Sequence, residues 1–256
     1  YGFAGADAES FQTIIDTTNA TVLPLSVCYR CPTSHIALAK AIVPEIEAAP
    51  NAIEGTVTEL AYDKVAETVS EGDIVLCRLT APLVSLCLSL IGSGISARVK
   101  GRDIGKGLVK LLREGLKRAR KTNRPSNLDG VPDAVEVQIK VEARKLMAKG
   151  VEEDDLKIQA LYDRRDALLA IYGWAEDAET VQGLERAIGD LFSNDRASVT
   201  LSTVHRAKGL EADRVFILQE EMMPLPFVKK AWERQQEYNL RYVALTRAKR
   251  DLVFIR

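Results

Sequence analysis

Short apolar segments rich in β-branched residues occur in two separate blocks of this chain, and this distribution most constrains the fold. The segments that favour strands are residues 21–27, 56–62 and 73–77 in the first block and 198–203, 214–219 and 252–255 in the second. Helical stretches alternate with them at 6–19, 33–49, 81–91 and 228–247. Strands that alternate with helices predict a parallel sheet with helices on both faces, so we expect an α/β fold.

The region between the two blocks, residues 103–195, has a different character. It contains several helical stretches and hardly any strand signal, and its clearest loop is 122–132, which has two prolines, one glycine, two asparagines and a serine. Proline and glycine are the strongest local breakers of helices and strands. We therefore predict a short helical insert that interrupts the sheet.

Composition excludes several classes of protein. The chain has 256 residues, a net charge of -1 and four cysteines, in no pattern typical of a secreted disulfide framework. Because the net charge is close to zero, any contact with nucleic acid must come from a local basic patch. The longest apolar run, 81–91, is too short to span a bilayer and contains two serines. We expect a cytoplasmic protein without membrane contact.

The phrase SVTLSTVHRAKGLEADRVFIL at 198–218 predicts a strand, a polar turn and a second strand. Ligands bind at the carboxyl ends of parallel strands, so the sequence predicts that Thr203, His205, Lys208 and Glu211 cluster there. Taken alone, Thr203 is more typical of a helix cap, His205 of a packed surface histidine, and Lys208 with Glu211 of a surface pair. The phrase as a whole closely resembles motif V of UvrD/Rep-like superfamily 1 DNA helicases, which implies nucleotide contacts from Gly209 and Glu211 and DNA contacts from Thr203 and His205.

The phrase EYNLRYVALTRAK at 237–249 is similar to motif VI of the same family. The resemblance implies that Arg247 reaches the γ-phosphate of ATP and is catalytic. A guanidinium suits this role because it is always charged and presents several donors. The alternative is that basic residues at the end of this helix only complement its dipole.

The phrase CYRCPTS at 28–34 is similar to motif IV. The resemblance implies that Tyr29 stacks on adenine and that Arg30 binds phosphate and is catalytic. Cys28 stands where asparagine is usual, and Cys31 with Pro32 interrupts the family pattern. The alternative is a zinc-stabilised nucleic-acid-binding protein, but Cys77 and Cys87 do not form the second close pair that such a site needs. Elemental analysis for zinc distinguishes the two.

The opening phrase YGFAGAD at 1–7 resembles the end of motif III, which implies that Phe3 stacks on a DNA base. Ala4 stands where many relatives have arginine, so one expected DNA contact is missing. Between residues 98 and 124, eleven lysines and arginines face two acidic residues, a local balance of +9. Arg102, Lys106 and Lys110 in this stretch are candidate DNA contacts, and a solvated surface helix is the alternative.

The resemblance as a whole implies a RecA-like parallel sheet flanked by helices. Residues 1–102 and 196–256 would form the second RecA-like motor domain, called 2A, and 103–195 a reduced 2B-like subdomain. No Walker A loop and no Walker B pair occur in the chain, so we expect it to be inactive alone. The first RecA-like domain of the same protein would supply these parts and the Mg²⁺ ligands.

The function implied is an ATP-dependent DNA helicase, that is, an ATP hydrolase that translocates on DNA. Its partners would be single-stranded or partly duplex DNA and the first RecA-like domain. The alternative on the same fold is a non-motor module that binds single-stranded nucleic acid, or a nuclease-associated subunit.

Overall fold

The computed structural model describes residues 10–23, 25–193 and 197–256. The strands are β1 (Val27–Cys28), β2 (Glu47–Ala48), β3 (Thr56–Leu60), β4 (Ile74–Cys77), β5 (Ala97–Val99), β6 (Val199–Thr203), β7 (Ala212–Leu218) and β8 (Ala248–Ile255). The helices are α1 (Ser10–Thr18), α2 (Thr33–Ala39), α3 (Val65–Thr68), α4 (Thr80–Gly92), α5 (Arg102–Lys121), α6 (Val131–Met147), α7 (Leu156–Trp174), α8 (Val181–Leu191) and α9 (Ala231–Leu245). Short 3₁₀ turns are η2 (Tyr62–Lys64), η3 (Val204–Arg206) and η4 (Glu220–Met222).

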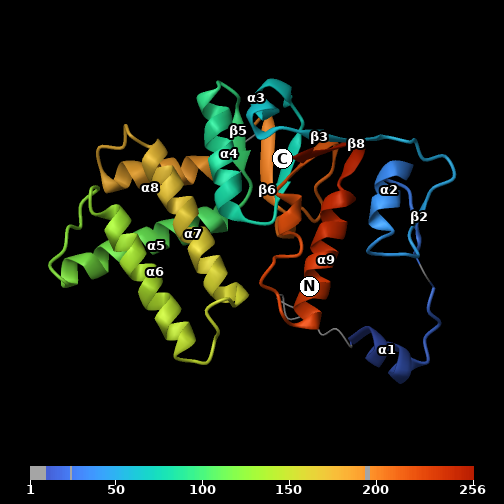
Figure 1. The fold of residues 1–256 in the computed structure, drawn as a ribbon, viewed down its shortest axis with the longest axis horizontal. Helices are drawn as coiled ribbons and strands as arrows, with labels where there is room; N and C mark the ends of the chain where they lie inside the picture. The colour runs from blue at the N-terminus through green and yellow to red at the C-terminus, as the bar shows by residue number, and fades with distance from the viewer. Residues whose placement is uncertain (1–9, 24, 194–196) are drawn as a thin grey trace.

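Six strands form one parallel sheet in the order β3-β8-β7-β4-β6-β5 (Figure 1). The predicted α/β, RecA-like fold is confirmed by this sheet and its flanking helices. Both blocks of the sequence contribute, because β4 from the first block lies between β6 and β7 from the second. Cys77 is level with both Thr203 and Leu218, so these three residues mark one edge of the sheet, which we call the carboxyl edge.

The central strands are buried on both faces, and alternate residues enter two different cores. Val75, Phe216 and Val253 belong to the larger core, which includes α4 and the insert helices. Leu76, Val215 and Leu252 belong to the smaller core, which includes α9. This burial explains why these strands are continuous apolar runs rather than alternating ones.

The insert consists of α5 to α8, which lie beside α4 in Figure 1. Helix α5 is amphipathic: Leu108, Leu111, Leu112 and Leu116 are buried and its charged residues point outward. The buried residues of α5 to α8 form one continuous core with α4 and the sheet. The carboxylate of Asp163 in α7 accepts hydrogen bonds from the backbone amides of Thr80 and Ala81, at 2.8–3.0 Å, and so satisfies the first turn of α4.

A small unit of β1, α2 and β2 packs beside the main sheet. Its parallel strands pair Val27 with Glu47. The imidazole Nε2 of buried His35 hydrogen-bonds the carbonyl of Thr56 in β3 at 3.0 Å. Gly55, with φ +70°, lies so close to Pro32 that a Cβ would be 2.4 Å from that ring. Only glycine combines this backbone conformation with such a close approach, which fixes the unit against β3.

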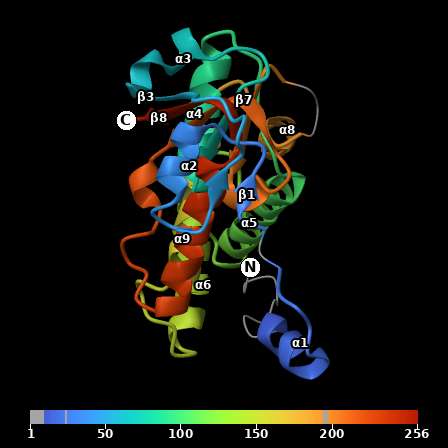
Figure 2. The same cartoon turned by 90° about the vertical axis from the view of Figure 1, so that its right-hand side faces the viewer.

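Two sequence predictions in this region are wrong. The predicted strand at 21–27 is reduced to Val27 in β1, because Leu23 and Leu25 are 80% and 101% exposed and no described part of the chain covers them. The predicted helix at 33–49 ends at Ala39, because Pro44 cannot continue it, and β2 forms instead. Helix α1 has no buried residue and lies away from the sheet in both views (Figures 1 and 2).

Among the described residues, no helix is both long enough and apolar enough to cross a membrane.

Candidate functional site

Three distant segments of the chain meet at a pocket of about 540 Å³. Cys28, Tyr29 and Arg30 reach it from the end of β1, Glu211 from the residue before β7, and Lys249 from the start of β8. The ring of Tyr29 is 82% exposed and therefore available to a ligand. The pocket combines an open aromatic face with cations, which suits a ligand that has both a planar ring and negative charge.

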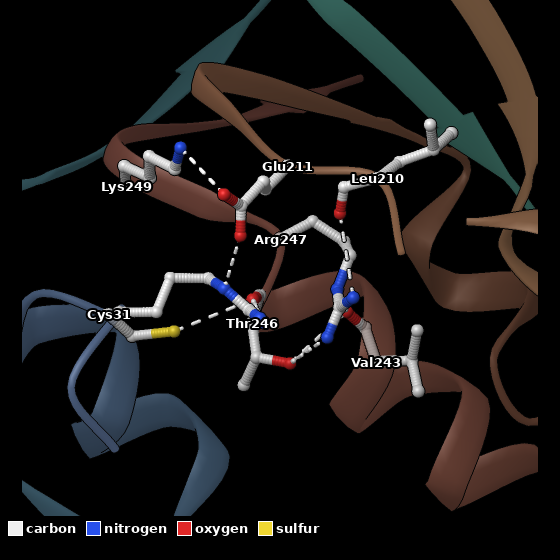
Figure 3. Close-up of polar contacts among 8 residues, drawn as sticks. Cys31, Leu210, Glu211, Val243, Thr246, Arg247 and Lys249 are labelled. Carbon is white, nitrogen blue, oxygen red and sulfur yellow. Dashed lines mark hydrogen bonds and ion pairs between the residues drawn. The ribbon is translucent and has the colours of Figure 1, made fainter. Parts of the chain in front are cut away.

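Glu211 bridges two cations at this pocket (Figure 3). Its carboxylate lies 2.7 Å from Nε of Arg30 and 2.7 Å from Nζ of Lys249. The hydrogen bond from Lys249, together with the charges of Lys249 and Arg30, lowers the pKa of Glu211. Because all three side chains are about 40% exposed, these pairs contribute little stability and can exchange for another anion.

Arg247 follows α9 and lies beside this pocket without lining it (Figure 3). Its Nε donates to the carbonyl of Val243 at 3.1 Å, and its guanidinium also contacts the carbonyl of Leu210 at 3.5 Å. Arg30 donates to the carbonyl of Thr246 at 3.4 Å. Backbone carbonyls therefore position both arginines, Arg30 in the pocket and Arg247 beside it. Gly209, with φ +86°, makes the turn that leads to Leu210 and Glu211.

The predicted cluster of Thr203, His205, Lys208 and Glu211 is wrong. Thr203 ends β6 at the carboxyl edge, whereas Glu211 precedes β7 at the opposite edge, which we call the amino edge. The seven residues of β7 separate the two edges by roughly 20 Å. The connection between them runs across one face of the sheet, where Val204 and Ala207 are buried against α9 and its neighbours, while Lys208 is exposed. Glu211 therefore joins Arg30 and Lys249, not Thr203.

The carboxyl edge holds a second polar group that the sequence did not reveal. Arg78, directly after β4, makes hydrogen bonds of 2.7, 2.9 and 3.1 Å with both carboxylate oxygens of Glu237 in α9. Glu237 is only 3% exposed. Burial, followed by the charges of Arg78 and Arg206, lowers the pKa of nearby His205 to about 4. His205 is thus neutral near pH 7 and can offer a hydrogen bond but no charge.

Residues 177–256 match the family model of the UvrD-like helicase C-terminal domain. This part of the chain is therefore similar to the C-terminal domain of UvrD-like helicases. The resemblance seen in the sequence is confirmed here, and the matched residues include β6, β7, α9 and β8, with Thr203, Glu211 and Arg247. Tyr29 and Arg30 lie outside the matched residues, but the fold brings them to the same pocket as Glu211 and Lys249.

The other predicted DNA contacts occupy two places. Phe3 lies outside the described residues. Arg102, Lys106 and Lys110 are exposed on α5, on the insert side of the UvrD-like domain. An ion pair between Arg206 and Asp103 connects the first turn of α5 with the carboxyl edge near His205. None of these cations takes part in the pocket at the amino edge.

Cys28 and Cys31 lie beside the pocket as free thiols. Burial, followed by the neighbouring Cys28, raises the pKa of Cys31 to about 12. The thiolate is the form that binds a metal, so this environment disfavours a metal ligand at Cys31. Within residues 10–23, 25–193 and 197–256, no group of three or more His, Cys, Asp or Glu residues could hold a metal ion.

Proposed function

We propose that this chain is the C-terminal motor domain of an ATP-dependent DNA helicase or translocase, in which it completes the ATP site. The observation that carries the proposal is that Tyr29, Arg30 and Glu211 line one pocket at the amino edge of the sheet, and that Arg247 contacts the carbonyl of Leu210, the residue next to Glu211. These residue types provide an aromatic surface, two permanent cations and one hydrogen-bond acceptor. ATP requires the same set for its adenine, its phosphates and its ribose.

In this proposal ATP lies between two RecA-like domains, the first of which belongs to the same protein. That domain would provide the Walker loop and the carboxylate for Mg²⁺, because this sequence contains neither. Tyr29 would stack on adenine and Glu211 would accept a hydrogen bond from ribose. Gly209 would hold the turn that places Glu211. The chain alone would not hydrolyse ATP.

The two arginines would stabilise the charge that develops on the γ-phosphate. Arg30 is paired with Glu211 in this structure, so it must exchange that carboxylate for a phosphate oxygen when ATP binds. This exchange costs little, because the pair is partly exposed. Loss of an arginine with this role typically lowers the rate of phosphoryl transfer by about 10³–10⁵.

Single-stranded DNA would pass along the carboxyl edge, in contact with Thr203 and His205, and Phe3 would stack on one of its bases. The chain between His205 and Glu211 links this edge to the ATP pocket, and its buried residues pack on the sheet. A shift of Glu211 on nucleotide binding would therefore be transmitted to Thr203 and His205 through a packed segment. Stepwise movement along DNA needs such a link between the two sites.

Single-turnover ATP hydrolysis tests the proposal, with a protein that contains both RecA-like domains, in the presence and absence of single-stranded DNA. We expect DNA-stimulated hydrolysis that falls by about 10³ or more in Arg247→Ala, with DNA binding retained. Arg250→Ala is the matched control, because Arg250 lies three residues further along the chain, in β8, where its side chain is exposed, whereas Arg247 is held beside the pocket by the carbonyls of Val243 and Leu210.

Hydrolysis that Arg247→Ala leaves unchanged would refute the role of Arg247. Absence of hydrolysis in the parent protein, with DNA binding present, would favour the non-motor nucleic-acid-binding module instead.

A further inference from the structure

The outward face of α5 carries five cations in register. Arg102, Lys106, Lys110, Arg113 and Lys117 follow one another at intervals of three or four residues, so they form one stripe along the helix. Leucines on the opposite face are buried against α6 and the rest of the larger core, so the stripe cannot turn away from solvent. At about 1.5 Å per residue, the stripe is roughly 22 Å long.

The stripe borders a groove of about 620 Å³ between α5 and the end of α8. Four of its cations line the groove, and Val109 and Phe192 contribute apolar surface. Among the described residues that line the groove, Glu114 is the only carboxylate. A groove with a row of cations and one opposing charge suits an elongated polyanion.

Most of these charges are not neutralised by the protein itself. Arg113 pairs with Glu185 at 2.7 Å, and Lys110 lies 3.8 Å from Glu114. Arg102, Lys106 and Lys117 make no ion pair within the part of the chain that the structure describes. When a polyanion binds, three uncompensated cations along one helix can displace the counterions condensed on the polyanion.

The position of the stripe connects it with the carboxyl edge. Arg206 follows His205 at that edge and pairs with Asp103 in the first turn of α5. Arg102, the first cation of the stripe, is the residue next to Asp103. The stripe therefore begins where the predicted path of the DNA along the carboxyl edge ends.

The charge of the whole chain makes this patch distinctive. The net charge is -1, and residues 98–124 carry eleven basic and two acidic residues, or +9. The rest of the chain therefore has a balance of -1 - 9 = -10. A polyanion is repelled by most of the molecule and attracted to this segment. The charge distribution therefore favours binding at the same place as the stripe and the groove.

We infer that the α5 stripe binds the phosphodiester backbone of the nucleic acid as it enters or leaves the carboxyl edge. The inference rests on the proposed function, which supplies nucleic acid as the ligand, and extends its path onto the insert. Lysine and arginine on a helix face recognise phosphates and not bases, so the contact is independent of sequence.

The experiment compares two triple variants of this chain by fluorescence anisotropy with labelled oligonucleotides at several salt concentrations. Lys106→Gln/Lys110→Gln/Lys117→Gln removes three charges from the stripe, and glutamine keeps the helix propensity of lysine. Arg144→Gln/Lys145→Gln/Lys149→Gln is the control, because it removes three charges from exposed residues at the end of α6, which do not line the groove. Oligothymidine, a duplex and a tailed duplex are the probes.

For the stripe variant, we expect the slope of log K against log salt to become shallower by about 2 on single strands or about 3 on duplex. The parent chain would then lose about 16-fold more affinity for single strands than the variant does between 50 and 200 mM salt. The control should keep most of the parent slope. The probe with the larger change identifies which form of DNA the stripe holds.

Equal slopes for the two variants would overturn the inference and leave the proposed function intact. Absence of binding by the parent chain to every probe would overturn the inference and count against the DNA contacts of the proposed function as well.

Discussion

Replacing Glu237 with glutamine should destabilise the fold more than any exposed charge change. The side chains of Glu237 and Arg78 are 3% and 14% exposed and share three hydrogen bonds. Glutamine keeps the shape but leaves the guanidinium of Arg78 in a buried place without its counter-charge. Breaking such a pair costs about 3–5 kcal/mol, and the residual exposure of Arg78 favours the lower end.

Urea denaturation measures this effect. With a slope of about 3 kcal/mol per molar, a loss of about 3 kcal/mol lowers the midpoint by about 1 M. Glu114→Gln is the control, because the pair of Glu114 with Lys110 is exposed and 3.8 Å long, and we expect a change of about 0.5 kcal/mol or less. The double variant Arg78→Met/Glu237→Met should recover most of the loss, since it removes both charges. A midpoint for Glu237→Gln within 0.2 M of the parent would refute the reasoning that the pair is desolvated.

Three further outcomes follow from the structure. Gly115→Ala should destabilise the chain by about 1–3 kcal/mol, because its Cβ would lie 2.8 Å from the carbonyl oxygen of Ala134. Gly107→Ala should stabilise the chain by about 0.5–1 kcal/mol, because its Cβ would meet nothing within 4 Å. Thermal unfolding compares the two variants. Because the folded pKa of His205 is about 4, below its unfolded value of about 6.5, the unfolded state binds the proton more tightly, so stability falls as the pH drops from 6.5 towards 4. We expect a loss of about 2 kcal/mol from this group between pH 7 and pH 5, which a smaller decrease for His205→Gln in urea titrations would verify. Burial raises the pKa of Cys31, Cys77 and Cys87 to about 12, so iodoacetamide at pH 8 should label the native chain at Cys28 alone; mass spectrometry that finds all four labelled without denaturant would contradict this.

The strands of the sheet were predictable because strands that are buried on both faces have an apolar composition. Runs such as Ile74–Cys77 are apolar at every position, and this is possible only where both faces of a strand are covered. Leu23 and Leu25 lie in a segment of similar composition that no described part of the chain covers, so a local pattern could not distinguish this segment from a strand. The order of the strands was not predictable, because β4 pairs with β6 and β7, which are far away in the sequence.

The candidate site was predictable in its residues but not in its arrangement. The motif phrases predicted Tyr29, Arg30 and Arg247; in the fold Tyr29 and Arg30 line the pocket, and Arg247 is held beside it by the carbonyl of Val243. Glu211 was assigned to the wrong edge, because the rule for ligands at strand ends does not account for a connection that crosses the sheet. Arg78 and Glu237 are 159 residues apart, and only the fold shows that they form a pair.

The continuous core that the sheet shares with the insert determines how the chain unfolds. Residues between α5 and α8 are contiguous in sequence, yet their leucines share one apolar cluster with α4 and with Phe216 of the sheet. Excision of this segment would strip one side of α4 and remove the carboxylate that satisfies its first amides. A shortened chain would therefore lose solubility rather than yield a smaller working domain. The insert and the sheet should unfold in one cooperative transition. The boundary of the insert in the sequence therefore does not separate two independently folding units.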